Sequence, residues 1–260
     1  MSLFRRAYNF ILYRIVPPHN MYTHKAERFY FEEYASHILP FFQKDKSLLD
    51  IGCQMGRFTI PAANAGMKIT ATDIKSGFFR FIKRQLKGYT QITFRKENLH
   101  QTCKAFPPES FDVILCIELL YNLPDPAENI QKLASLLKPG GVLITSHRTP
   151  GYYIYRFVKT RDFEAINQVM EDTHPHYNAQ TVEELKQMLR DSNLCVKCVE
   201  PIGMFSGFGK DAFTCFANPV MLKSEEKAAL KVLETDRRLK SLFCNNARYL
   251  LAVGKKTSNQ

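Results

Sequence analysis

A short stretch near residue 50 combines an acid and two glycines in an order that suggests ligand binding. Residues 48–59 read LLDIGCQMGRFT, so Asp50 ends an apolar run and Gly52 and Gly56 follow it. A glycine in such a turn lets a ligand approach the backbone, because no side chain is in the way. The G-x-x-x-G spacing differs from the G-x-G-x-x-G of dinucleotide-binding turns. A carboxylate here repels phosphate and favours a ligand with a positive charge.

A second acid follows the next apolar segment. The sequence ITATD places Asp73 about 20 residues after Gly52, where a carboxylate can accept both hydrogen bonds of a ribose diol. Asp50 and Asp73 together describe a site for a nucleoside that carries a cationic amino-acid tail. S-adenosylmethionine has this chemistry, and we therefore predict it as the cofactor.

The elements that must position these acids alternate between strands and helices. Short apolar segments predict strands at 47–51, 68–72, 91–95, 111–116, 141–146, 194–200 and 247–253. Amphipathic segments predict helices near 56–65, 76–87 and 126–137, and a capping box from Thr181 to Glu184 begins another helix. This alternation is typical of an α/β fold with helices on both faces of the sheet, in which ligands bind at the carboxyl ends of the strands.

Five motifs in this order resemble those of class I S-adenosylmethionine-dependent methyltransferases, from about residue 45 to residue 254. The motifs are LLDIGCQMG, TATD, FDVILCIELLYNLPDP, LLKPGGVLITS and NNARYLLAVGKK. The resemblance implies a Rossmann-like, seven-stranded mixed sheet, mostly parallel with an antiparallel last strand. It also implies that Gly52 and Gly56 shape the cofactor loop, that Asp50 orients the methionine ammonium and that Asp73 binds the ribose.

The resemblance implies further cofactor contacts. Asn98 is expected near the adenine amine, and Ile117 is expected to contact the cofactor through its main chain. The further candidate contacts are Cys53, Gln54, Ile74, Leu99 and Cys116. Gln54 departs from the family pattern D-x-G-x-G-x-G, because it replaces the middle glycine. If that position needs a positive φ, glutamine costs about 1 kcal/mol; otherwise its side chain points away. A protein that has lost the cofactor is the alternative.

Methyl transfer to an oxygen needs a nearby base in addition to proximity. His147, which directly follows LITS, and His174, within THPHYN, are the candidate bases. For His147 a purely structural hydrogen bond is the alternative. His174, His176 and the nearby Glu171 also have metal-binding side chains, but a surface turn is the favoured interpretation, and we predict no metal.

Aromatic residues cluster in two segments, 147–180 and 203–240, which the fold places over the cofactor. We predict a lid over a small lipophilic or aromatic acceptor; ordinary core packing is the alternative. FDVILCIELLYNLPDP, TSHRTPGYY and DTHPHYNAQTVEEL resemble the ubiquinone-biosynthesis O-methyltransferases, which implies O-methylation of a phenol. The stretch 151–170 departs from that subgroup.

The charge balance favours anionic partners. The 36 Lys and Arg residues exceed the 25 Asp and Glu residues, for a net charge of +11. Four basic residues form one stripe on the helix predicted at 76–87: Arg80, Lys83, Arg84 and Lys87. This stripe is either a solvated face, a surface for anionic lipids, or a track for a nucleic-acid backbone. An RNA methyltransferase is therefore the second hypothesis, although no N-P-P-Y-type motif is present.

The organisation of the chain predicts one domain. We expect a methyltransferase domain at 46–254, a helical segment at 1–45 and a tail at 255–260. Within the helical segment, residues 3–16 have the apolar stripe of a helix that packs on its own domain or rests on an anionic membrane. A non-catalytic membrane adaptor is the third hypothesis. Seven scattered cysteines indicate a reducing compartment, so we expect a cytoplasmic protein, either soluble or peripheral on a membrane.

Overall fold

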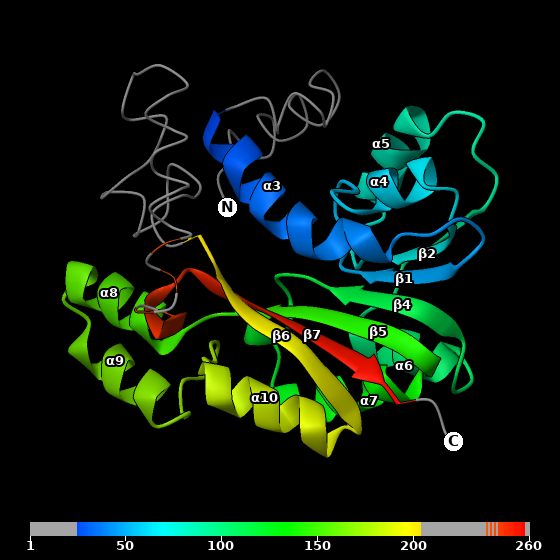
Figure 1. Cartoon of the computed structure of the whole chain (residues 1–260). Helices are drawn as coiled ribbons and strands as arrows, with labels where there is room; N and C mark the ends of the chain where they lie inside the picture. The colour runs from blue at the N-terminus through cyan, green and yellow to red at the C-terminus, as the bar shows by residue number, and fades with distance from the viewer. Residues whose placement is uncertain (1–24, 204–237, 239, 241, 243, 258–260) are drawn as a thin grey trace.

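The computed structural model describes residues 25–203, 238, 240, 242 and 244–257. Its centre is a seven-stranded sheet with the strand order β3-β2-β1-β4-β5-β7-β6 (Figure 1). Strands β1 to β5 pair with one another in parallel, whereas β7 is antiparallel to both β5 and β6. The mixed, mostly parallel sheet predicted above is confirmed. The strands are β1 Ser47–Ile51, β2 Lys68–Thr72, β3 Ile92–Arg95, β4 Phe111–Cys116, β5 Leu137–His147, β6 Leu194–Ile202 and β7 Tyr249–Lys256.

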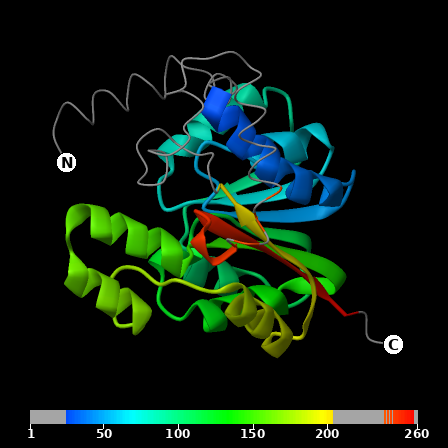
Figure 2. The same ribbon diagram turned by 60° about the vertical axis from the view of Figure 1, so that its left-hand side comes forward.

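Helices cover both faces of this sheet. In Figure 1, α3, α4 and α5 lie on one face, while α6, α7 and α10 lie on the other. The pair α8 and α9 stands beyond the end of β5 (Figure 2). The helices are α3 Lys25–Ile38, α4 Thr59–Asn64, α5 Gly77–Gln85, α6 Leu99–Ala105, α7 Pro126–Ser135, α8 Pro150–Thr160, α9 Phe163–Met170 and α10 Val182–Asp191, with 3-10 turns η1 Leu39–Phe41, η2 Leu120–Asn122 and η3 Cys244–Asn246.

Each face of the sheet has its own hydrophobic core. Tyr34 of α3 and Ile82 of α5 are fully buried in the first core, and Leu133 of α7 and Leu189 of α10 are fully buried in the second. Burying a large apolar side chain contributes about 1.5–3 kcal/mol, so these contacts fix the helices to the sheet. Phe79 and Ile82 of α5 and Leu86 at its end are all buried.

The strand order creates a crevice at the carboxyl ends of β1 and β4. From β1 the chain proceeds outward through β2 to β3, and it then returns to pair β4 with the other side of β1. Ligands bind in open α/β sheets at such a reversal. Asp50 pairs with Leu115 of β4, and Ile51 pairs with Thr72 of β2. The register therefore brings the ends of β1, β2 and β4 to one edge.

Several elements differ from the predictions. The helix predicted at 56–65 begins only at Thr59, because Gly56 has a φ of 81°, which is not helical. The strand predicted at 141–146 starts at Leu137, with a shift in register opposite Phe111. The segment 147–180, predicted to be irregular, contains α8 and α9. The final strand runs to Lys256, so the predicted tail begins two residues too early.

Two predicted features lie outside the described residues. These are the amphipathic helix at 3–16 and most of the second lid segment, 203–240. Among the residues that are described, no helix has both the length and the apolar character needed to cross a bilayer.

Candidate active site

The loop after β1 is folded back against the end of β2. The backbone N–H groups of Gly52 and Cys53 both donate to the carbonyl oxygen of Thr72, at 2.9 and 3.0 Å. The N–H of Gly56 closes the turn by donating to the carbonyl of Cys53 at 2.8 Å. The φ angles of Gly52 and Gly56 are 73° and 81°, in the left-handed region that glycine adopts readily. The two predicted glycines therefore shape this loop.

Gln54 also has a positive φ, of 43°. Of the two alternatives for this residue, the one in which the position needs a positive φ is therefore correct. Glutamine carries a conformational cost of about 1 kcal/mol here. Its side chain is exposed, while its backbone N–H donates to Oδ2 of Asp73 at 3.0 Å. The N–H of Lys75 donates to Oδ1 of the same carboxylate at 2.8 Å. The strained backbone of Gln54 therefore helps to orient the predicted ribose acid.

Asp50 is buried at the end of β1. The Thr59 hydroxyl donates to its Oδ2 at 2.5 Å. Burial raises the pKa of Asp50 to about 6, against the lowering effects of the Thr59 hydrogen bond and the Arg57 charge. Loss of water favours the neutral acid, so a positively charged ligand group beside Asp50 restores the carboxylate.

The other predicted contacts fall into two groups. Ile74 follows Asp73 and is 62% exposed, so it offers an apolar surface beside the ribose acid. Leu99 and Cys116 are buried in the core on one face of the sheet, and Ile117 in the core on the other. The predicted main-chain contact of Ile117 is compatible with this burial, and the contacts of Leu99 and Cys116 stay predictions.

Asn98 has a structural role that the sequence analysis did not assign. Its side-chain oxygen accepts the N–H of Gln101 at 2.8 Å, and the Gln101 side chain returns to the Asn98 N–H at 3.0 Å. This reciprocal capping box begins α6. Asn98 is therefore a helix cap, and its contact with adenine stays a prediction.

These residues fit S-adenosylmethionine in charge and in shape. Two buried carboxylates lie at neighbouring strand ends, and the loop between them bends at glycines. A Cβ added to Gly52 would meet Leu119 at 3.4 Å, an ordinary van der Waals distance, so it is the positive φ and not a lack of space that favours glycine here.

Comparison with known proteins decides the family. A family model described as a methyltransferase domain matches residues 22–199. The chain belongs to this family. It is a class I S-adenosylmethionine-dependent methyltransferase, and its cofactor is S-adenosylmethionine.

Individual relatives and structures agree with this assignment. The methyltransferase is 29% identical over 162 residues to a ubiquinone biosynthesis O-methyltransferase of Nitrosospira multiformis, covering 61% of this chain and 66% of that protein. It is 32% identical over 151 residues to a protein of the same name from Xanthomonas campestris pv. campestris, covering 56% and 62%. The matches therefore span slightly less than two thirds of these relatives.

Solved structures share the fold. An S-adenosylmethionine dependent methyltransferase from Mesorhizobium loti superposes with a TM-score of 0.58 at 17% identity, covering 87% of this chain and 98% of the other. A methyltransferase from Methanosarcina mazei gives a TM-score of 0.56 at 19% identity, covering 86% and 98%.

His147, the first candidate base, is completely buried. Its Nδ1 lies 3.0 Å from the Gln180 side-chain oxygen, which can only accept, so we assign the proton to Nδ1. Nε2 then accepts from the Thr145 hydroxyl at 2.9 Å. Burial lowers the pKa of His147 to about 4, which keeps the ring neutral. The geometry supports the structural alternative and not the role of base.

His174, the second candidate, lies in an aromatic cluster. Its ring stacks on Phe157 with centroids 5.8 Å apart, and Tyr177 lies 4.8 Å away. Nδ1 accepts the backbone N–H of His176 at 3.1 Å, so the lone pair of the neutral ring is already engaged. Burial lowers the pKa of His174, and the charges of His176 and Arg156 lower it further. His174 must release this hydrogen bond before it can accept a proton.

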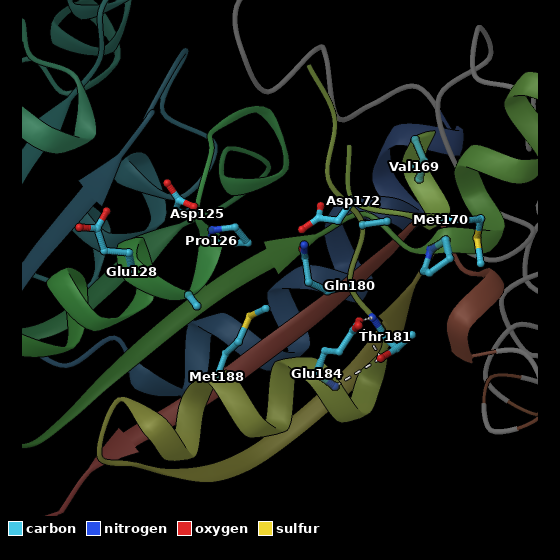
Figure 3. Close-up of a pocket in the computed structure, with 13 residues that line it drawn as sticks. Asp125, Pro126, Glu128, Val169, Met170, Asp172, Gln180, Thr181, Glu184 and Met188 are labelled. Carbon is cyan, nitrogen blue, oxygen red and sulfur yellow. Dashed lines mark hydrogen bonds between the residues drawn. The ribbon is translucent and has the colours of Figure 1, made fainter. Parts of the chain in front are cut away.

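A cavity of about 500 Å³ lies between α7, α9 and α10 (Figure 3). Asp125, Glu128, Asp172 and Glu184 surround it, together with Met170 and Met188. None of the predicted cofactor contacts lines this cavity, so it is separate from the edge described above. Within the described part of the chain, no group of three metal-binding side chains occurs.

Sequence reasoning missed one element of the active site, an ion pair between Arg57 and Glu118. Arg57 directly follows Gly56, and Glu118 directly follows Ile117. The two residues lie 61 positions apart in the chain. Only the pairing of β1 with β4 brings them together, so no local pattern reveals the contact.

Proposed function

We propose that the protein transfers the methyl group of S-adenosylmethionine to an oxygen of a small aromatic or lipophilic acceptor, most favourably a phenol. The observation that carries this proposal is the aromatic cluster that follows β5 directly. Tyr153 of α8 lies 5.2 Å from Tyr177 and 6.1 Å from Phe157, ring centre to ring centre. Aromatic side chains in such offset arrangements suit a flat apolar ligand.

A buried hydroxyl supports the same proposal. Tyr153 is 1% exposed, and its hydroxyl finds no hydrogen-bond partner among the described residues. A buried polar group without a partner costs about 1–3 kcal/mol, so phenylalanine would be preferred here if packing were the only requirement. We propose that this hydroxyl binds a polar group of the acceptor.

The chemistry of the site favours an acidic oxygen. When bound, S-adenosylmethionine supplies a methyl group on a positively charged sulfur. An acceptor oxygen can attack this methyl carbon in line with the carbon–sulfur bond, and the neutral thioether is the leaving group. Asp50 and Asp73 bind and orient the two ends of that cofactor. His147 and His174 both have their free lone pairs engaged in hydrogen bonds. A phenol, with a pKa near 10, loses its proton far more easily than an alcohol and depends less on a strong base.

The names of the relatives support an oxygen acceptor. Proteins about 30% identical to this chain are named ubiquinone biosynthesis O-methyltransferases. Because the matches cover less than two thirds of those proteins, the acceptor proposed here is the broader class of phenols. We further propose that the protein works in the cytoplasm, at a membrane surface where lipophilic phenols accumulate.

The proposal is tested with the purified protein and methyl-labelled S-adenosylmethionine. The acceptors are a catechol with a short isoprenyl chain, the same compound without its two oxygens, and total cellular RNA. We expect label only in the catechol, and we expect Asp73→Asn to abolish transfer while Asp172→Asn, an exposed acid at the separate cavity, has no effect. Label in RNA and none in the catechol would overturn the proposal in favour of the RNA methyltransferase.

A second variant tests the acceptor site itself. Tyr153→Phe removes one oxygen atom and keeps the ring. We expect it to raise the KM for the catechol about fivefold or more, which corresponds to the loss of one hydrogen bond, and to leave cofactor affinity unchanged. Tyr177→Phe is the matched control, because the Tyr177 hydroxyl already has Arg156 as a neighbour at 3.4 Å.

A further inference from the structure

A partly buried ion pair joins the cofactor loop to the end of β4. Nη1 of Arg57 lies 2.8 Å from Oε1 of Glu118, and the two side chains are only 19% and 15% exposed. The Arg57 guanidinium also lies over the rings of Tyr34 and Phe58, with centroids at 5.5 and 5.3 Å. These contacts hold a positive charge inside a site that must accept a positively charged cofactor.

Glu118 is held in place from several sides. Its φ is 57°, an uncommon conformation for a residue other than glycine. Its backbone N–H donates to the Ser146 hydroxyl of β5 at 2.7 Å, and the Tyr249 hydroxyl of β7 donates to Oε2 at 3.1 Å. Burial and the Glu118 charge raise the pKa of Tyr249, so that this hydroxyl remains a donor. Ser146 of β5 thus holds the backbone of Glu118, and Tyr249 of β7 holds its carboxylate opposite Arg57.

The position of Arg57 makes its charge important. The Arg57 charge is close enough to Asp50 to lower the pKa of that acid. Arg57 therefore lies on the side of the site where Asp50 is predicted to attract the cofactor, and its charge, if unbalanced, would repel the sulfonium of S-adenosylmethionine. For any two unit charges about 8 Å apart at an effective dielectric constant of about 20, Coulomb's law gives a change of about thirtyfold in affinity, which sets the scale of the effect to be expected.

We propose that Glu118 is the charge-balancing residue of the cofactor site: by pairing with Arg57 it removes the repulsion that the sulfonium would otherwise meet. Arg57 can then pack against the loop after Gly56 and stiffen it without lowering the affinity for S-adenosylmethionine. Glu118 is a positioning residue in this account, because it acts through Arg57. The inference rests on the cofactor and does not depend on the identity of the acceptor.

The test compares two ligands that differ in charge. S-adenosylhomocysteine has the same nucleoside and the same amino-acid tail as S-adenosylmethionine, but its sulfur is neutral. We expect Glu118→Gln to weaken S-adenosylmethionine about ten- to thirtyfold in calorimetry, and S-adenosylhomocysteine about threefold or less, because the unbalanced Arg57 acts most strongly on the sulfonium. Glu183→Gln, which breaks the exposed Glu183–Lys186 pair of α10, is the matched control and should change neither affinity.

A second variant moves the selectivity in the opposite direction. Arg57→Met keeps an unbranched apolar stem over Tyr34 and Phe58 but leaves the Glu118 charge unbalanced. We expect the preference for S-adenosylmethionine over S-adenosylhomocysteine to increase at least threefold above that of the unmodified protein. The double variant Arg57→Met with Glu118→Gln should return the preference to within about twofold of the original.

The direction of these changes in ligand preference distinguishes a loss of charge balance from a general loss of structure at the site. If Glu118→Gln does not fold, two outcomes still test the proposal. Arg57→Met should increase the preference for S-adenosylmethionine, and the double variant should return that preference to the original value. Equal weakening of both ligands in every variant would show that the pair only supports the loop, and the proposal would be overturned. Unchanged affinity for both ligands in Glu118→Gln would overturn it as well.

Discussion

Gln54 takes part in the site through its backbone, which the identity of its side chain does not reveal. The residue has a φ of 43° and donates its N–H to Asp73. A glycine adopts that conformation without steric cost and keeps the same N–H. Gln54→Gly should therefore leave the melting temperature equal or slightly higher, and the dissociation constant of S-adenosylmethionine equal or lower, when measured by thermal unfolding and calorimetry.

Gln54→Ala is the matched control for this prediction. Alanine removes the exposed side chain but keeps the Cβ that strains the backbone. If Gln54→Gly and Gln54→Ala both weaken the cofactor more than tenfold, the glutamine side chain contacts the ligand, and the backbone explanation is wrong.

We expect cofactor binding to depend on pH through Asp50. Its pKa is raised from 3.8 to about 6 by burial, so ionised Asp50 destabilises the cofactor-free protein. This cost is absent below about pH 4, grows as the pH rises, and is fully present above about pH 6. A cationic ligand needs the ionised form. The dissociation constant of S-adenosylmethionine should therefore increase about tenfold between pH 7 and pH 5, as one proton must be released on binding.

Asp50→Asn tests the origin of this pH dependence. The amide has nearly the same shape but does not ionise, so binding should be weaker and almost constant from pH 5 to pH 7. A variant that keeps the full pH dependence would assign the proton to another group.

At the scale of elements, α5 has two faces with different roles. Phe79 and Ile82 are buried against the sheet, whereas the four basic residues of the predicted stripe are exposed. Those residues line a surface groove of about 650 Å³, together with Ser76 and Phe79. The groove contains none of the acids of the cofactor site. Its chemistry is that of a surface for anionic groups.

Charge reversal of this stripe should separate membrane binding from cofactor binding. With Arg80, Lys83, Arg84 and Lys87 changed to Glu, we expect sedimentation with phosphatidylglycerol vesicles to be lost, since each basic residue near such a surface contributes about 1 kcal/mol. Cofactor affinity should not change, because these side chains point to solvent. Retained vesicle binding would contradict the prediction. Salt-sensitive RNA binding that the unmodified protein shows and the charge-reversed variant lacks would favour the RNA methyltransferase.

The elements themselves were largely predictable. Alternating apolar segments located all seven strands, because parallel strands buried on both faces are continuous apolar runs. The acids and glycines of the cofactor loop followed from their place at strand ends. Asn98 and His147 were less predictable, since a polar residue after a strand has the same sequence signature whether it caps a helix, braces a turn or binds a ligand.

At the scale of the whole molecule, contacts between distant segments could not be read from the sequence. Arg57 with Glu118, and His147 with Gln180, each join residues that neither propensity nor periodicity relates. They depend on strand order and register, which are properties of the complete fold. The aromatic segment after β5 illustrates the same limit, because its composition indicated a lid but not the helices α8 and α9.

The way in which α8 and α9 join the rest of the protein has an evolutionary consequence. The N–H of Gln180 donates to the carbonyl of Arg148 at 2.9 Å, so the chain leaves the sheet and returns to it at nearly the same point. Asn178 ties the returning segment to η2 through the carbonyls of Leu120 and Leu123. Residues 149–177 thus form an excursion with a closed base. If this excursion binds the acceptor, as proposed, a change in its length or shape would alter acceptor choice while the strand ends that bind the cofactor are inherited unchanged.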